Sequence, residues 1–452
     1  MVLNKKKIRK KQLTPPQILT SGFATVIFIG TLLLNTPMAS VETGSVGWVD
    51  ALFTATSAVC VTGLVVVDTG TYWSVFGQSV IAILIQIGGL GFMTMATLFA
   101  VVLGRKISLK ERLIIQQAIG QDTISGVVRF TLYLLVIAFS IEAVGAVILA
   151  FQFVPEFGLK TGIGYAVFHA ISAFCNAGFD LMGNGSSLTG YVTNPLVNLT
   201  VITLILTGGV GFTVLLDLYN ASRPKDFSLH TRIVLLISIG LLLVGTVIYL
   251  LLEWNNPGTL GNLNGPQKLM ASIFQSVTPR TAGFNTIDTG SLTDASQFFT
   301  IILMFIGGSP ASTAGGIKTV TFGVVLLMAV SVIRGNDRVT IFNKTIPADI
   351  IKRAMTVAII AVNLVIGITM IMTVMEPNFA FMQILFEVTS AFGTVGLSTG
   401  ITPQLSDASR LLLVLVMYSG RVGILTVAFA LARKQHNYRD LVRYAEEKVI
   451  VG

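Results

Sequence analysis

The sequence has few charged residues for its length. Only 11% of its 452 residues are Asp, Glu, Lys or Arg, whereas 53% are hydrophobic. A soluble protein of this size needs far more polar surface, so the scarcity of charge excludes a soluble globular fold and predicts an integral membrane protein.

Residues that commonly build metal or catalytic sites are also scarce. The two cysteines, Cys60 and Cys175, have no histidine nearby and therefore do not indicate a metal site. The three histidines are scattered, and neither an HExxH motif nor paired carboxylates occur, which argues against a membrane-embedded enzyme. His169 is expected to pack as a structural residue. Without a GxGxxG unit on a strand, any control by nucleotides must come from another chain.

The placement of the basic residues predicts how the chain crosses the membrane. The net charge of +9 gathers at both ends and between hydrophobic stretches, so we interpret it as membrane topology rather than nucleic-acid binding. The basic N-terminal run precedes an apolar segment without a cleavage site, which predicts an uncleaved first span. The positive-inside rule then gives eight spans with both termini cytoplasmic. We expect them near 17–36, 74–103, 129–153, 194–219, 231–252, 296–333, 353–375 and 408–432.

Four shorter apolar segments lie between the spans of each outward-and-return pair, at 48–66, 163–181, 267–286 and 379–400. Each leads through Ser or Thr into a loop centred on a glycine, at position 63, 178, 283 or 396. A second landmark follows each glycine by 24 to 30 residues and reads GGLGF, GGVGF, GGSPA or GRVGI. Two landmarks recurring four times in register indicate internal repeats.

These repeats predict the fold class. Each contains two full crossings, so all four enter the membrane in the same sense and share an axis along its normal. We therefore expect an all-α integral membrane protein with four parallel repeats, each with two transmembrane helices and a re-entrant pore loop, around a central pseudo-fourfold ion pore. The expected repeats are 1–104, 105–222, 223–340, in which the second helix is broken, and 341–452.

The four loops are predicted to form one selectivity filter. Backbone carbonyls suit a hard monovalent cation, the fourth loop carries the TVG core of a potassium filter, and glycine allows carbonyls to turn inward. The short helices would aim their negative ends at the ion. The alternative is four Gly-rich turns that only join helices. The residues expected to bind K+ are Cys60, Val61, Thr62, Gly63, Cys175, Asn176, Ala177, Gly178, Thr281, Ala282, Gly283, Thr394, Val395 and Gly396.

Several charged residues lie near these loops. Arg280 would repel a cation in the pathway, so we expect its side chain behind the filter, paired with Glu387 or Asp288. Asp68, Asp180 and Asp288 follow filter glycines closely. They either attract cations to the outer mouth or end the loops as Asx turns, and the sequence does not distinguish these roles.

The sixth span is interrupted by GGSPASTAGGIKT, residues 307–319. As a cytoplasmic loop it would leave halves too short to cross, so we predict an unwound loop that gates the pore from inside the membrane. Arg421 lies in mid-span, where arginine is costly, and should bond to the loop carbonyls and form an electrostatic barrier. A structural pair with Glu142 is the alternative. The expected gate comprises Gly307, Gly308, Ser309, Pro310, Ala311, Ser312, Thr313, Ala314, Gly315, Gly316 and Arg421.

The four filter glycines, the GGSPASTAGGIKT loop and the SGRVG segment around Arg421 resemble the Trk/Ktr/HKT superfamily of potassium transporters, most closely its Ktr-type membrane subunits. The resemblance covers nearly the whole chain. It implies K+ as the transported ion, and Gly63, where sodium carriers often have serine, favours potassium. It also implies a plasma-membrane homodimer with a pore in each protomer, a cytosolic ring of KtrA-like nucleotide-binding subunits, and Na+ as an activator. The rival function is a sodium-coupled carrier with alternating access, against which the parallel, even-span repeats argue.

Overall fold

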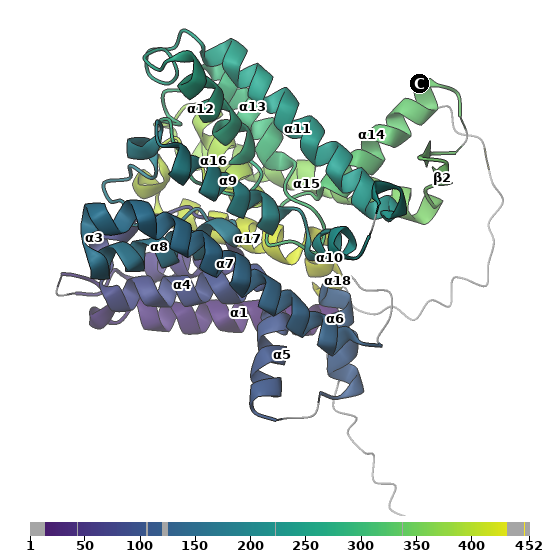
Figure 1. The fold of residues 1–452 in the computed structure, drawn as a ribbon, viewed down its shortest axis with the longest axis horizontal. Helices are drawn as coiled ribbons and strands as arrows, with labels where there is room; N and C mark the ends of the chain where they lie inside the picture. Colours follow the sequence, from purple (N-terminus) through teal and green to yellow (C-terminus); the bar gives the residue numbers. More distant parts are fainter. Residues whose placement is uncertain are drawn as a thin grey trace, which may run out of the picture.

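The computed structural model describes residues 14–42, 44–104, 107–119, 125–221, 223–336, 338–431 and 447 (Figure 1). Within them, four helices are individually long and apolar enough to cross a membrane. These are α1 (Pro15–Leu34), α7 (Val127–Phe157), α11 (Leu229–Glu253) and α15 (Ala348–Met375). Only 22% to 33% of each apolar window is buried, so most of these side chains face outward, as they do in lipid.

Three further predicted spans are bent helix pairs. Each bend falls on a glycine of the second landmark, Gly91, Gly211 or Gly423, with φ between 88° and 100°. Glycine reaches this region at little cost. The sequence predicts one span at each of these places and did not predict the bends. The pairs are α4 (Val75–Leu90) with α5 (Phe92–Val102) at 102°, α9 (Pro195–Gly209) with α10 (Phe212–Asn220) at 95°, and α17 (Asp407–Val422) with α18 (Ile424–Leu431) at 99°.

The sixth predicted span is divided into two helices. α13 (Asp294–Phe305) ends just before the glycine-rich segment, and α14 (Thr319–Ile333) begins at its last residue. The stretch between them is not helical, where the sequence predicts an unwound loop. Pro310 and four glycines account for this because both residue types disfavour a helix interior.

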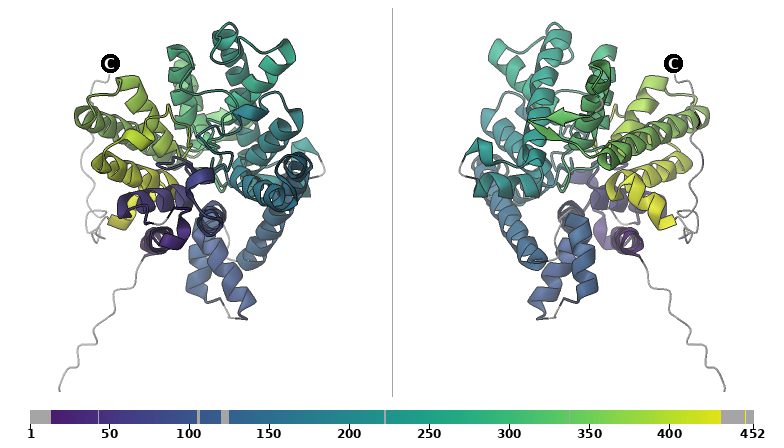
Figure 2. Two further views of the ribbon diagram at one scale, coloured as in Figure 1. Left: turned by 90° about the vertical axis from the view of Figure 1, so that its left-hand side faces the viewer. Right: turned by 90° about the vertical axis from the view of Figure 1, so that its right-hand side faces the viewer.

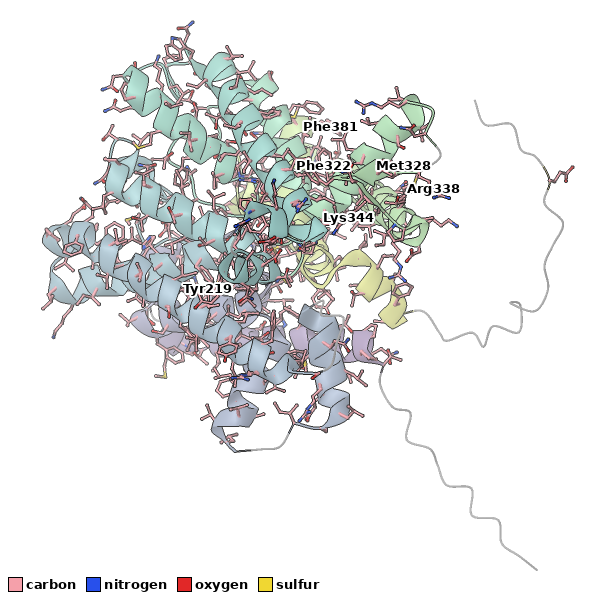
Figure 3. All side chains as sticks on the ribbon, turned by 45° about the vertical axis from the view of Figure 1, so that its right-hand side comes forward. Tyr219, Phe322, Met328, Arg338, Lys344 and Phe381 are labelled. Atoms are coloured by element: carbon pink, nitrogen blue, oxygen red, sulfur yellow. The ribbon has the colours of Figure 1, made fainter. Side chains whose placement is uncertain are left out.

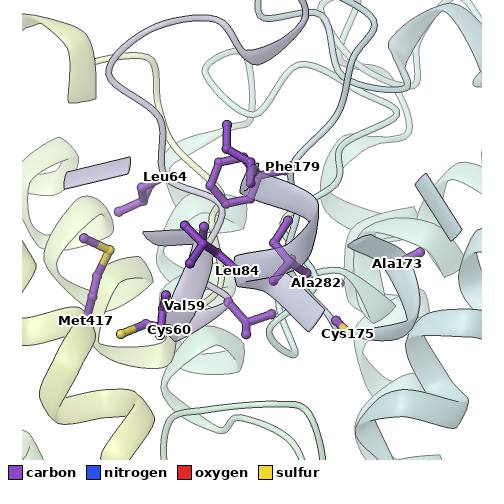
Figure 4. Packing of buried hydrophobic residues seen from close by; sticks show 14 of the residues in the cluster. Val59, Cys60, Leu64, Leu84, Ala173, Cys175, Phe179, Ala282 and Met417 are labelled. Carbon is purple, nitrogen blue, oxygen red and sulfur yellow. The ribbon is translucent and has the colours of Figure 1, made fainter. Parts of the chain in front are cut away.

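Four short helices coincide with the predicted pore-loop segments. They are α2 (Trp48–Cys60), α8 (Leu159–Phe174), α12 (Gly265–Val277) and α16 (Phe381–Gly393). In contrast to the long helices, their C-terminal ends are fully buried. Val59, Cys60, Ala173, Cys175 and Ala282 all lie in one buried cluster at these ends (Figure 4). The C-terminal ends of the short helices therefore meet at the centre of the molecule.

The elements are arranged around this centre in the order of the sequence (Figure 2). The chain passes from the purple α1 through teal and green segments to the yellow α18. α1 contacts α18, and α2 contacts α17, so the last part of the chain packs against the first. This closed arrangement brings four segments far apart in sequence to one place.

The remaining elements are short. β1 (Thr340–Ile341) and β2 (Lys344–Thr345) form an antiparallel hairpin, which the sequence analysis did not predict, in a fold that is otherwise helical. Phe342 and Asn343 both have positive φ, as a two-residue hairpin turn requires. Arg338 and Lys344 lie at this end of the molecule (Figure 3). The others are α3 (Thr69–Tyr72), α6 (Leu109–Ile119), η1 (Pro37–Ala39), η2 (Thr189–Tyr191), η3 (Pro224–Asp226) and η4 (Thr402–Gln404).

Candidate functional site

The four glycines predicted to form a filter lie next to one another in a closed ring. A methyl group added to any of them would collide with a backbone carbonyl of the next loop segment. Each segment thus touches its successor, and the fourth returns to the first. The colliding pairs are Gly63 with Ala177, Gly178 with Ala282, Gly283 with Val395, and Gly396 with Thr62.

The backbone changes handedness at the same two positions in all four segments. The glycines have φ between 69° and 94°, and the residue two positions before each is also left-handed. These residues are Val61, Asn176, Thr281 and Thr394, with φ of 58°, 58°, 73° and 50°. Three of them are β-branched, for which positive φ is a true outlier. Such strain persists only where its surroundings hold it, and it concentrates at functional sites. Alternating handedness also turns successive carbonyls toward one side, as an ion filter needs.

The Ser or Thr that precedes each loop holds the strained segment. In the first and fourth segments, Ser57 Oγ accepts from the Gly63 amide and Ser390 Oγ from the Gly396 amide, both at 3.1 Å. In the second and third segments, the hydroxyl instead donates to the carbonyl of the residue that follows the filter glycine. Ser172 donates to Phe179 at 2.7 Å, and Thr278 donates to Phe284. These bonds explain why a hydroxyl recurs at this place.

The second landmark packs directly behind the loops. Its first glycine meets the carbonyl of the residue four positions before the filter glycine, in three of the four repeats. The contacts are Gly88 with Val59, Gly208 with Phe174, and Gly420 with Phe392, and in each a Cβ would collide with the oxygen. The first glycine of the landmark recurs because two backbones approach each other closely at this position.

The cysteines and Glu142 belong to the wall behind the first two loops. Both cysteines are buried and free. Gln86 Nε2 donates to both Glu142 carboxylate oxygens, at 2.9 and 3.0 Å, and Cys175 Sγ lies 3.8 Å from Glu142 Oε1. Glu142 therefore does not pair with Arg421, and the structural alternative for that arginine is wrong. Sequence reasoning missed Gln86, although a polar residue two positions before the GG landmark was a usable signal.

The predicted pairing of Arg280 is also wrong. Its Nη1 donates to the Ser238 carbonyl on α11 at 3.1 Å, behind the third loop. Glu387 instead accepts from Ser398, Thr399 and Thr402. Asp288 accepts from the Gly290 amide at 3.1 Å. Each carboxylate satisfies its own loop, which leaves the arginine without an acidic partner among the described residues.

The three aspartates after the loops act as turn residues. Asp68 accepts from the Thr71 amide at 2.9 Å, Asp180 from Met182 at 3.0 Å and Asp288 from Gly290. These bonds to amides two or three residues onward form Asx-type turns, the second of the two sequence interpretations. His169 is likewise structural, since Nδ1 bonds to the Tyr165 carbonyl and Nε2 accepts from the Leu181 amide.

Segment 307–319 lies directly against the ring. Thr313 Oγ1 donates to the Phe174 carbonyl at 3.2 Å, and a Cβ on Gly315 would collide with the Thr394 side chain. The Ser309 and Thr313 amides donate to Gly209 and Gly208 at 3.0 and 3.2 Å. The segment therefore touches the second and fourth loops and the second landmark of repeat two.

Arg421 ties this segment to the first repeat. Its guanidinium donates to the carbonyls of Thr313, Gly88 and Gly89, the last at 3.0 Å. Lys318, absent from our predicted site, adds a second cation by donating to the Ala314 carbonyl. Both cations line a cavity of about 220 Å³ next to the segment, together with Leu90, Phe92 and Phe212. The Arg421 guanidinium and the Lys318 amine therefore lie on the same side of the segment.

Known proteins resemble this chain over its full length. The family model described as "TrkH: Cation transport protein" matches residues 3–441. The Ktr system potassium uptake protein B of Bacillus subtilis (strain 168) is 46% identical over 100% of both chains. The potassium/sodium uptake protein NtpJ of Enterococcus hirae is 41% identical, again over 100% of both. Among solved structures, the potassium transporter TrkH from Vibrio parahaemolyticus matches 95% of this chain and 87% of its own with a TM-score of 0.73. Its 18% identity limits that likeness to the fold.

Proposed function

Because the chain belongs to the TrkH family of cation transport proteins, we propose that it carries potassium into the cell as the membrane subunit of a Ktr-type uptake system. The names of its relatives from B. subtilis and from Vibrio alginolyticus, at 46% and 38% identity, support potassium and the Ktr system. The protein is a multi-pass membrane protein and not an enzyme.

In this proposal the ring is a selectivity filter. Four parallel repeats, 1–104, 105–222, 223–340 and 341–452, each supply one re-entrant loop to a single central pore. Carbonyls of Val61, Asn176, Thr281 and Thr394 and of the residues that follow them replace the water around K+. The observation that carries the proposal is the ring itself, with the same strained positive-φ pair in all four segments.

Segment 307–319 is the gate in this proposal. It stands beside the ring, is not helical, and is held by isolated hydrogen bonds, among them those of Thr313 to Phe174 and to Arg421. An ion passes when the segment withdraws from the pathway. Arg421 opposes withdrawal through its bond to Thr313 and adds a positive barrier.

Family membership supports a proposal for the surroundings of the pore. We propose a homodimer in the plasma membrane with both termini cytoplasmic, a cytosolic ring of KtrA-like nucleotide-binding subunits, and activation by Na+. The basic clusters support this orientation through the positive-inside rule. The terminal residues themselves lie largely outside the described part of the chain.

A sodium-coupled carrier with alternating access is the second candidate. The name of the E. hirae relative, a potassium/sodium uptake protein, is the observation that favours it. Coupling would make K+ uptake depend on a Na+ gradient, whereas a filter conducts K+ down its own electrochemical gradient.

Rubidium uptake into liposomes that contain the purified protein distinguishes the potassium filter from the sodium-coupled carrier. We expect uptake without a Na+ gradient, strong competition by K+ and weak competition by Na+. Gly63→Ser should abolish this preference, because Gly63 has φ of 88° and its Cβ would meet Ala177. Gly158→Ser is the matched control, with φ of 81° and nothing within 4 Å of its Cβ, and should keep the preference. Equal competition by Na+ and K+ in the wild type would refute the proposed filter.

A further inference from the structure

Arg280 is a buried cation with unused hydrogen-bond donors. The residue is 7% exposed and lies three positions before the third filter glycine. Nη1 donates to Ser238, but Nε and Nη2 have no partner in the described chain. Burying a charged donor without an acceptor is unfavourable, so this arrangement calls for a reason other than the stability of the present conformation.

The same guanidinium borders a cavity behind the gate segment. The cavity has a volume of about 180 Å³ and lies between α9, α11 and the end of α12. Gly308, Ser309 and Thr319, from the two ends of the gate segment, form part of its wall, together with Arg280. A cavity of this volume is much larger than a single water needs and leaves space for part of a moving backbone.

We propose that Arg280 is a positioning residue for ion flux, which receives the gate segment when that segment leaves the pathway. The inference rests on the proposed gate. Arg421 holds one position of the segment through Thr313, and Arg280 would hold the other. Its acceptors would be the Ser309 carbonyl and the hydroxyls of Ser309 and Thr319. In the present conformation these two hydroxyls bond to each other at 3.0 Å.

The two arginines should therefore have opposite effects on flux. Arg421 favours the blocked position, whereas Arg280 favours the withdrawn one, so its loss reduces the population that conducts. Arg280→Met should lower the maximal rate of rubidium uptake by about tenfold, the effect of one charge-assisted hydrogen bond. The half-saturating K+ concentration and the preference for K+ over Na+ should not change, because the filter itself is intact.

The experiment compares three single variants, Arg280→Met, Arg280→Lys and Arg421→Ala, with the double variant that combines Arg280→Met and Arg421→Ala. Size-exclusion chromatography first shows that each variant is folded. Arg280→Lys should recover part of the rate, and the double variant should lie between the single ones. Lys268→Met is the matched control. Lys268 is a buried cation on α12, the helix that precedes Arg280; it is 8% exposed and donates to the Trp254 carbonyl rather than to the gate segment. Its replacement should leave uptake within about twofold of the wild type.

Two results would overturn the proposal. Uptake by Arg280→Met equal to or above that of the wild type would show that Arg280 does not favour conduction. Loss of the K+ preference, or a double variant as slow as Arg280→Met, would place the effect in the filter. A different result would refute the proposed function, namely a wild-type protein that does not prefer K+ over Na+.

Discussion

Replacing Arg421 with alanine is the most direct test of the gate. In the described conformation, Arg421 joins a fixed helix to the gate segment. Two of its acceptors, Gly88 and Gly89, belong to α4, and the third, Thr313, belongs to the segment. Of these three bonds, only the one to Thr313 has to break when the segment withdraws. Arg421→Ala removes that bond without changing any residue of the segment or the ring.

The expected effect of Arg421→Ala on the gate equilibrium can be calculated from the bond between Arg421 and Thr313. A hydrogen bond from a charged donor contributes about 1.5–3 kcal/mol. Since about 1.4 kcal/mol corresponds to tenfold, its loss should raise the ratio of withdrawn to blocked conformations by roughly 10- to 150-fold. The maximal rate of rubidium uptake should rise by the same factor until most molecules conduct. Loss of the positive charge acts in the same direction.

Initial rubidium uptake at several K+ concentrations measures this effect. Arg410→Ala is the control on the same helix, because Arg410 bonds to Asp50 at 2.6 Å, away from the gate segment. It should lower the melting temperature slightly and leave uptake unchanged. A folded Arg421→Ala protein whose maximal rate stays within about twofold of the wild type would contradict the reasoning.

Two further predictions concern stability. Glu142→Ala leaves the buried Gln86 amide without its acceptor and should cost about 1–3 kcal/mol, measured by thermal unfolding in detergent. Adding Gln86→Ala should cost little more, and fully additive losses would show that this bond is not the cause. Burial raises the pKa of Glu376, but hydrogen bonds from Ser406 and Ser409 outweigh it and hold that pKa below its usual value of 4.5. This stabilisation is present above pH 4.5 and is lost as the pH falls through the lowered pKa. Glu376→Gln should therefore reduce the fall in melting temperature on acidification, and an unchanged acid transition would refute the assignment.

The central features were predictable because they constrain residue type. A backbone with positive φ in contact with another backbone admits almost no residue but glycine. Gly63, Gly178, Gly283 and Gly396 therefore stand out at a regular spacing. The interruption before α14 was visible for the same reason, as proline and glycine are rarely found together inside a helix.

Features that depend on the rotation of helices were not predictable. Arg280 had two plausible acidic partners in the sequence, yet it bonds to the Ser238 carbonyl, which has no sequence signature. Glu142 likewise faces Gln86 because α4 and α7 meet at that angle. The bend at Gly91 was within reach, but the same glycine-rich landmark also fits an uninterrupted helix.

A common physical cause connects these successes and failures. The ring, its support from the second landmark and the contacts of Arg421 all depend on main-chain oxygens, such as those of Val59, Thr62 and Thr313. Carbonyls leave no mark of their own in a sequence, but the space they need does. A site built from carbonyls is therefore recognised by the glycines that let backbones meet, and its specificity should be more sensitive to an added methyl group at those glycines than to changes in neighbouring side chains.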